Sequence, residues 1–264
     1  MRPDFSKLTV IGLTMVLCGT GGFSTKPADA ADDARCAGER GTKPVNEARK
    51  LVDALRRELA GLENQIRDHP YPRALEAHQV SIENLKAFAG EQYNIIRSDF
   101  RSDALMVNRF GTTRSGTLLH GIMDGEAQAL PLLLDFAKAL GLDEDQLRKY
   151  EPRPGAQAFP AYVASLALYG SEAEIGAAFL MNFPIFGENT GRMSAALQRN
   201  YGLTQHDVAF FDFFASPIPN FECDALSMIQ QGLDHEASPS LVERAARLLQ
   251  AYEKLFWDTV AEEK

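Results

Sequence analysis

Apolar residues recur at steps of three and four along most of the chain, the spacing that places them on one face of an α-helix. The clearest case is residues 46–67, with apolar positions Ala48, Leu51, Val52, Leu55, Leu59, Leu62 and Ile66. Similar patterns cover residues 81–105, 117–140, 156–169, 171–200, 204–214, 221–231 and 239–262. No stretch alternates apolar and polar residues as a half-buried strand does.

Short segments rich in proline and glycine separate the predicted helices. The sequences HPYP at 69–72, RPG at 153–155 and GS at 170–171 each interrupt a helical pattern, as proline and glycine do. Seven or eight helices joined by such connections predict an all-α helical bundle. A chain of 264 residues is compatible with one hydrophobic core.

The N-terminus has the pattern of a signal peptide over residues 1–30. Arg2 and Lys7 precede an apolar run at 8–18, and the small-residue sequence ADA lies at 28–30. The run is too short to span a bilayer. We therefore expect an exported protein, periplasmic or secreted, with no membrane attachment after cleavage. The alternative is a mis-assigned N-terminus ahead of a cytoplasmic protein.

Residues 31–45 are small and polar and predict a mobile lead-in to a folded domain at 46–264. Removal of the signal peptide would take Cys18 with it and leave Cys36 and Cys223. In an oxidising compartment these two cysteines can form a disulfide. The sequence leaves open whether they pair or remain free thiols, because it does not give the distance between them.

The charge and the histidine pattern exclude several classes of function. The formal net charge of −9 repels a nucleic-acid backbone, so we expect no nucleic-acid partner. None of the histidines lies at helical spacing from another, and no HExxH motif is present; they are His69, His78, His120, His206 and His235. We therefore predict no metal site and no cofactor.

Aromatic residues are concentrated between positions 179 and 221: Phe179, Phe183, Phe186, Tyr201, Phe210, Phe211, Phe213, Phe214 and Phe221. Such a cluster is typical of a hydrophobic core. An apolar ligand pocket with a few placed polar groups would show the same enrichment, but we expect most of these residues to belong to the core. The pattern alone leaves both interpretations open.

Three separated segments carry a family resemblance. They are YEKLFWD at 252–258, Tyr162 followed by LYGSE at 168–172, and FFAS at 213–216. Together they resemble the TenA/thiaminase II group of the TENA/THI-4/PQQC family, which has the haem-oxygenase-like fold. The resemblance implies a helical bundle around a substrate pocket, and it also implies a homo-oligomer.

Two pocket residues of that family are matched here. The resemblance makes Glu253 the catalytic or anchoring acid and Tyr162 a pocket phenol that contacts the ligand. The nucleophilic cysteine of thiaminases falls at Asn182, which cannot attack a ring as a thiolate does. An amide can still hydrogen-bond to the edge of an aminopyrimidine.

Other family positions are changed. Two family tyrosines correspond to Phe186 and Phe214, which would stack on a ligand. The family's aspartate on an earlier helix corresponds to Gln92, which would contact polar ligand atoms, and the neighbouring Tyr93 would donate a hydrogen bond. These residues predict a protein that binds, and can process, a small aromatic or N-heterocyclic, pyrimidine-like molecule without thiaminase nucleophilic catalysis.

Two alternatives remain at this stage. The first is a non-catalytic binding or interaction protein that keeps the fold, because the changed positions make the interior more apolar. The second is a haem-oxygenase-like di-iron oxidase, although the corresponding ligand positions hold Phe214, Ile218 and Phe221, which cannot bind iron. An axial haem histidine is also missing from residues 46–67.

Overall fold

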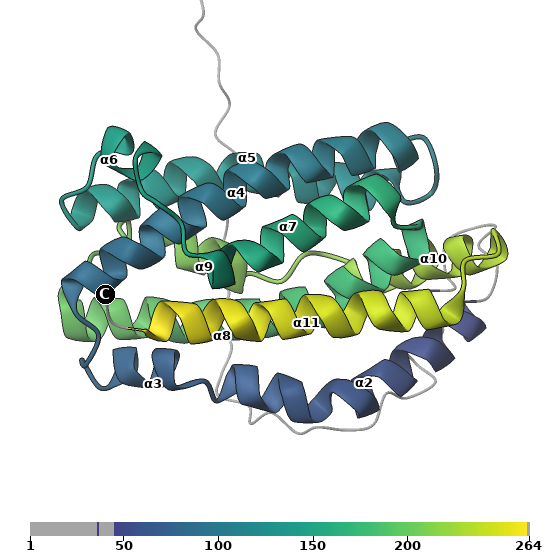
Figure 1. The fold of residues 1–264 in the computed structure, drawn as a ribbon, viewed down its shortest axis with the longest axis horizontal. Helices are drawn as coiled ribbons and strands as arrows, with labels where there is room; N and C mark the ends of the chain where they lie inside the picture. Colours follow the sequence, from purple (N-terminus) through teal and green to yellow (C-terminus); the bar gives the residue numbers. More distant parts are fainter. Residues whose placement is uncertain (1–35, 37–44, 263–264) are drawn as a thin grey trace, which may run out of the picture. The chain divides into compact units, whose positions relative to one another are not determined.

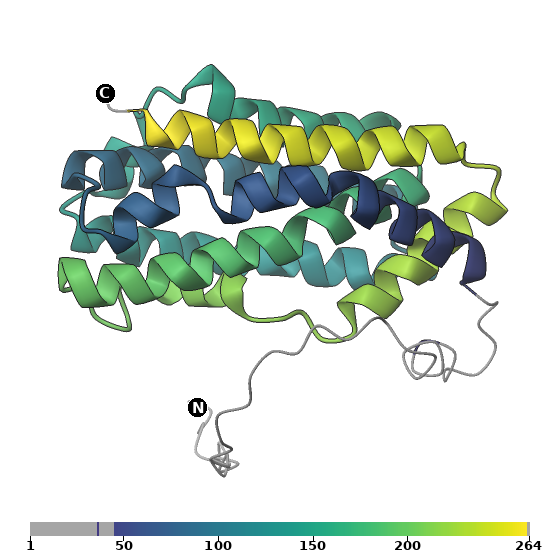
Figure 2. The same cartoon turned by 90° about the horizontal axis from the view of Figure 1, so that it is seen from below.

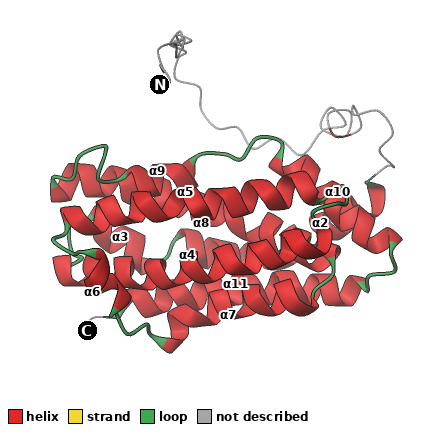
Figure 3. Cartoon of the chain, turned by 90° about the horizontal axis from the view of Figure 1, so that it is seen from above, coloured by secondary structure: helices red, strands yellow, loops and turns green. Residues whose placement is uncertain are grey.

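The computed structural model describes Cys36 and residues 45–262. The predicted signal peptide and most of the predicted lead-in lie outside these residues. Within them the chain is helical and has no strand (Figure 3). The helices are α2 (Asn46–Arg67), α3 (Pro70–Glu76), α4 (Ile82–Phe110), α5 (Gly116–Ala139), α6 (Glu144–Arg148), α7 (Pro154–Tyr169), α8 (Glu172–Tyr201), α9 (Ala209–Ala215), α10 (Phe221–Asp234) and α11 (Pro239–Ala261).

The long helices of the domain run side by side (Figures 1 and 2). Helix α4 packs against α5 and α7, while α8 packs against α9, α10 and α11. Helix α11 also packs against α7 and α2 and therefore joins the two groups. The predicted all-α bundle is confirmed. In the described part of the chain, none of the helices has the length and apolar character needed to cross a bilayer.

Most predicted helices agree with the structure to within a few residues, but two short helices were not predicted. Helix α3 begins at Pro70, where the sequence suggested only a break. His69 caps it, because its Nδ1 accepts a hydrogen bond from the Tyr71 backbone N–H at 3.2 Å, and proline is well tolerated in a first helical turn. Helix α6 starts with a capping box between Asp143 and Gln146.

The predicted helix at 204–214 was partly wrong. The helix α9 begins only at Ala209. Before it, the Asp207 carboxylate accepts hydrogen bonds from the backbone N–H and the hydroxyl of Thr204 at 2.8 Å and 2.7 Å. This local side-chain bonding replaces the first turns of the expected helix.

Aromatic side chains dominate the core between α4, α5, α9 and α11. Phe88 of α4 contacts Phe211 of α9 and Phe256 of α11, with ring centroids 5.7 Å and 6.0 Å apart. Phe136 of α5 meets Phe211 edge to face at 4.8 Å. Of the predicted aromatic cluster, Phe179, Phe210 and Phe211 are buried and the other six residues are partly buried. Each close aromatic pair adds about 0.5–1.5 kcal/mol beyond its buried area.

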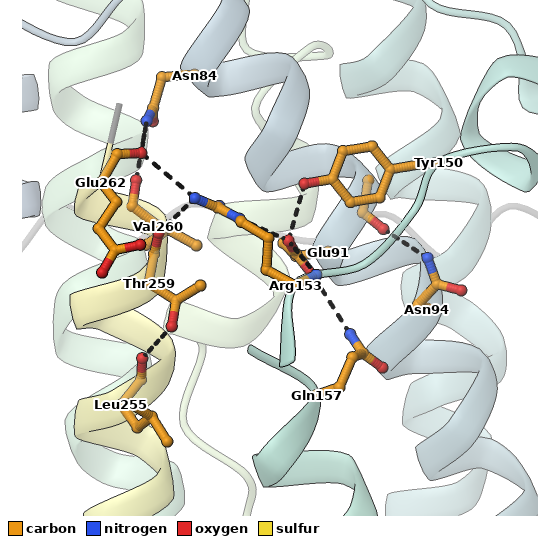
Figure 4. Close-up of polar contacts among 11 residues, drawn as sticks. Asn84, Glu91, Asn94, Tyr150, Arg153, Gln157, Leu255, Thr259, Val260 and Glu262 are labelled. Atoms are coloured by element: carbon orange, nitrogen blue, oxygen red, sulfur yellow. Dashed lines mark hydrogen bonds and ion pairs between the residues drawn. The ribbon is translucent and has the colours of Figure 1, made fainter. Parts of the chain in front are cut away.

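A buried ion pair fixes the end of α11 against α4 and α7 (Figure 4). Glu91 of α4 is fully buried and accepts hydrogen bonds from Arg153 Nε at 2.9 Å and from the Tyr150 hydroxyl at 2.8 Å. The Arg153 guanidinium also donates to the backbone carbonyl oxygens of Thr259 and Glu262 at the end of α11. These contacts hold the helix that carries Glu253.

Candidate functional site

The candidate site is centred on Glu253, in the middle of α11. Its side chain is 3 % exposed, and its Oε1 accepts a hydrogen bond from Trp257 Nε1 at 2.6 Å. The two residues are one helical turn apart, which places them on the same inward face. The resemblance suggested an inward-facing acid at this position, and the structure buries it there.

Burial raises the pKa of Glu253 to about 7. The low-dielectric surroundings disfavour the carboxylate, and hydrogen bonds from Trp257 and Asn182 offset only part of that effect. A carboxyl group with such a pKa is partly protonated near neutral pH. It can therefore donate or accept a proton at the pH at which most enzymes work.

Asn182 reaches the same site from α8. It is 2 % exposed, and its Nδ2 donates to Gln250 Oε1 at 3.2 Å, while Gln250 Nε2 donates to the Met181 carbonyl at 2.9 Å. Gln250 is one turn before Glu253 on α11. A continuous set of amides thus joins the Glu253 carboxyl to the backbone of α8.

Aromatic side chains form the next part of the site. The ring of Phe186 lies 6.1 Å from Trp257 and 5.3 Å from Phe214, both measured between centroids. Phe186 and Phe214 are only partly buried, whereas Trp257 is fully buried. The site therefore combines one acid, two amide side chains and a row of aromatic rings, drawn from α8, α9 and α11.

The three remaining predicted site residues are not hydrogen-bonded to Glu253 in the described part of the chain. Tyr162 of α7 packs against Tyr252, with centroids 5.3 Å apart, on a different face of α11. The Tyr93 hydroxyl donates to Glu144 at 3.0 Å, toward α6. Gln92 is buried on α4 at 4 % exposure.

The Phe-Trp-Asp segment contributes in a way that the sequence did not reveal. Asp258 accepts hydrogen bonds from Lys254 Nζ at 2.7 Å and from His69 Nε2 at 3.1 Å. Burial alone would raise the pKa of Asp258, but these two partners lower it below its usual value. Asp258 thereby fastens α11 to the start of α3, beside Trp257.

His69 is a structural residue. Burial lowers its pKa, and the hydrogen bond to Asp258 only partly compensates. Because Nδ1 accepts the Tyr71 N–H, the neutral ring carries its proton on Nε2 and donates it to Asp258. Among the described residues, no group of three or more His, Cys, Asp or Glu side chains is placed to hold a metal ion.

The fold defines the class of this protein as haem-oxygenase-like. A domain of unknown function with that fold from Shewanella denitrificans is similar to it, with a TM-score of 0.62 at 14% identity over 79% of this chain and 90% of that one. A TenA homologue from Pseudomonas syringae superposes with a TM-score of 0.70 at 13% identity over 83% and 97% of the two chains. A TenA homologue from P. horikoshii superposes with a TM-score of 0.63 at 17% identity, over 80% of this chain and 97% of that one.

The family follows from the sequence itself. The sequence profile of the TENA/THI-4/PQQC family matches residues 56–263. The chain therefore belongs to this family, as the three segments suggested. None of the curated proteins gives a match.

Proposed function

We propose that the protein binds a small aromatic or N-heterocyclic molecule between Glu253, Asn182 and the rings of Phe186 and Phe214. The observation that carries this proposal is the buried Glu253 carboxyl, whose pKa of about 7 lets it bind a ring nitrogen either as donor or as acceptor. Flat aromatic ligands suit the partly buried phenylalanines next to it.

Proton transfer is the chemistry that these residues support. Asn182 offers an amide in place of the thiaminase nucleophile, so a covalent adduct at this position is not proposed. Glu253 would exchange a proton with the ligand, and Trp257 would hold the carboxyl in place through its Nε1 hydrogen bond. Any turnover should then depend on pH around the Glu253 pKa.

Thermal stabilisation by a panel of compounds tests the proposal, because a ligand that binds only the folded protein raises its melting temperature. The panel comprises thiamine, its aminopyrimidine and thiazole fragments, haem, a bilin and Fe²⁺. We expect the aminopyrimidine to raise the melting temperature of the wild type but not of Glu253→Gln. The control variant Glu83→Gln, which removes a carboxylate that is 81% exposed in the wild type, should be stabilised as the wild type is. Stabilisation by haem or iron alone, or by nothing in the panel, would contradict the proposal.

A non-catalytic role is the second candidate, and one observation favours it. The Asn182 amide is already bonded to Gln250, whose own amide is bonded to the Met181 carbonyl. A site whose polar groups satisfy one another loses those bonds when a ligand enters. Under this candidate, Glu253→Gln would change stability without changing the response to any compound.

Export remains part of the proposal. Cys36 and Cys223 are both disulfide-bonded in the structure, which supports an oxidising compartment such as the periplasm or the extracellular space. Thiol titration of protein recovered from its native compartment tests this. We expect no thiol at either cysteine before reduction, and two free thiols there would oppose export.

A further inference from the structure

One face of α4 changes from aromatic to acidic along its length. Phe88 marks the inward direction, because its ring contacts Tyr71, Phe211 and Phe256. Asp99 follows after about three helical turns and so points in nearly the same direction. Its side chain is buried, with 8 % exposure, where the pattern calls for an apolar residue.

Helix α5 has the same irregularity opposite α4. Its inward stripe consists of Leu119, Ile122, Ala129, Leu133 and Phe136, all buried. Glu126 occupies the stripe at the same three- and four-residue spacing. The two helices pack against each other, and Phe136 and Phe88 contact the same ring of Phe211.

Two buried carboxyl groups of α4, Asp99 and Asp103, therefore lie near the partly buried Glu126 of α5. Asp103, one turn after Asp99, is 2 % exposed. Glu126 and Asp103 both act electrostatically on Asp99 and raise its pKa beyond the effect of burial, and burial raises the pKa of Asp103 to about 7. Burial, reinforced by Asp103, also raises the pKa of Glu126.

This group lacks a positive partner within the described residues. Asp99 Oδ1 is buried and accepts no hydrogen bond there, and no Lys, Arg or His is among the charges that act on Asp99, Asp103 or Glu126. Buried carboxylates without a partner are strongly destabilising. Proteins rarely retain such an arrangement without a compensating charge.

We propose that Asp99, Asp103 and Glu126 form a binding site for a protonated amine. An ammonium group has three donors, one for each carboxyl, and one of them would satisfy Asp99 Oδ1. The site uses α4 and α5, not the Glu253 residues, so it does not depend on the function proposed above.

Calorimetry on the full protein with n-butylamine, and with n-butanol as the uncharged probe of the same shape, tests this site. We expect saturable binding of the amine only. Loss of a charge-assisted hydrogen bond should weaken it at least about tenfold in Asp99→Asn and Glu126→Gln. Asp124→Asn, which removes an exposed carboxylate of α5, and Glu253→Gln should bind as the wild type does.

Melting temperatures of the unliganded variants provide a check on folding, since Asp99→Asn removes a buried charge and should melt at or above the wild type. Several results would overturn the proposal: equal binding of butanol, unchanged amine binding in Asp99→Asn, saturable binding of Mn²⁺ or Zn²⁺ in place of the amine, or no binding of either probe. The last would mean that the three carboxyl groups are satisfied by sharing protons.

Discussion

Replacing Glu253 by glutamine should stabilise the protein at alkaline pH and have little effect at acidic pH. The carboxyl pKa is about 7 in the folded protein against an ordinary value of 4.5. The folded state therefore binds more protons than the unfolded chain between these two values, and stability falls as pH rises from about 4.5 to 7. Glutamine keeps the shape and the acceptor for Trp257 but carries no charge to bury.

The size of the effect follows from the two pKa values. Their difference makes the charged form about 3 kcal/mol less favourable in the folded protein. Most of this difference, about 2–3 kcal/mol, arises between pH 5 and pH 8, because some of the loss has already occurred below pH 5. The wild type should lose that much relative to Glu253→Gln over this range.

Urea unfolding at pH 5 and pH 8 measures the difference directly. The exposed variant Glu83→Gln is the control and should change stability equally at both pH values. Other buried acids, such as Asp103, also titrate in this range, but they are common to both proteins and cancel. A constant difference between Glu253→Gln and wild type at the two pH values would refute a raised Glu253 pKa.

Two further pairs of substitutions, each a test and its control, probe the packing of Tyr150 and Arg153 (Figure 4). A Cβ on Gly90 would lie 2.4 Å from the Tyr150 ring, so Gly90→Ala should destabilise the protein by about 1–3 kcal/mol. The control is Gly61→Ala. A Cβ at that position has nothing within 4 Å, so this substitution should stabilise the protein by up to about 1 kcal/mol. Arg153→Ala leaves the buried Glu91 carboxylate without its ion-pair partner and should lower the free energy of unfolding by about 3–5 kcal/mol. The control Arg148→Ala removes an exposed ion pair with Glu144 and should lower it by less than about 1 kcal/mol. Urea midpoints check both pairs, and equal effects within either pair would contradict the packing described.

Much of the fold could be predicted because the long helices have strong apolar periodicity. Helices α2 and α11 end within a residue of their predicted limits. Helices α3 and α6 are too short to show a period, although the capping box of Asp143 and Gln146 was a readable signal for α6. The start of α9 depends on a local bond between Thr204 and Asp207 that competes with helix formation.

The candidate site was only partly predictable. Sequence resemblance pointed to Glu253 as an inward-facing acid, and the structure buries it, while its role in a site stays a prediction. The one-turn spacing to Trp257 could have indicated their hydrogen bond. The directions of Tyr93 and Tyr162 depend on which neighbouring helix covers each face, and that information is absent from a local pattern. Outside this site, the burial of Asp99 was also missed, although the sequence shows an acid on the apolar stripe of α4.

The central claim, that Glu253 and its aromatic neighbours bind a small heterocycle, is tested most directly by the fluorescence of Trp257. It is the only tryptophan in the chain, and its Nε1 is bonded to the Glu253 carboxyl. Titration with the aminopyrimidine fragment of thiamine at pH 7 should change its emission saturably in the wild type and not in Glu253→Gln. No saturable change in the wild type, or the same change in both proteins, would contradict the claim.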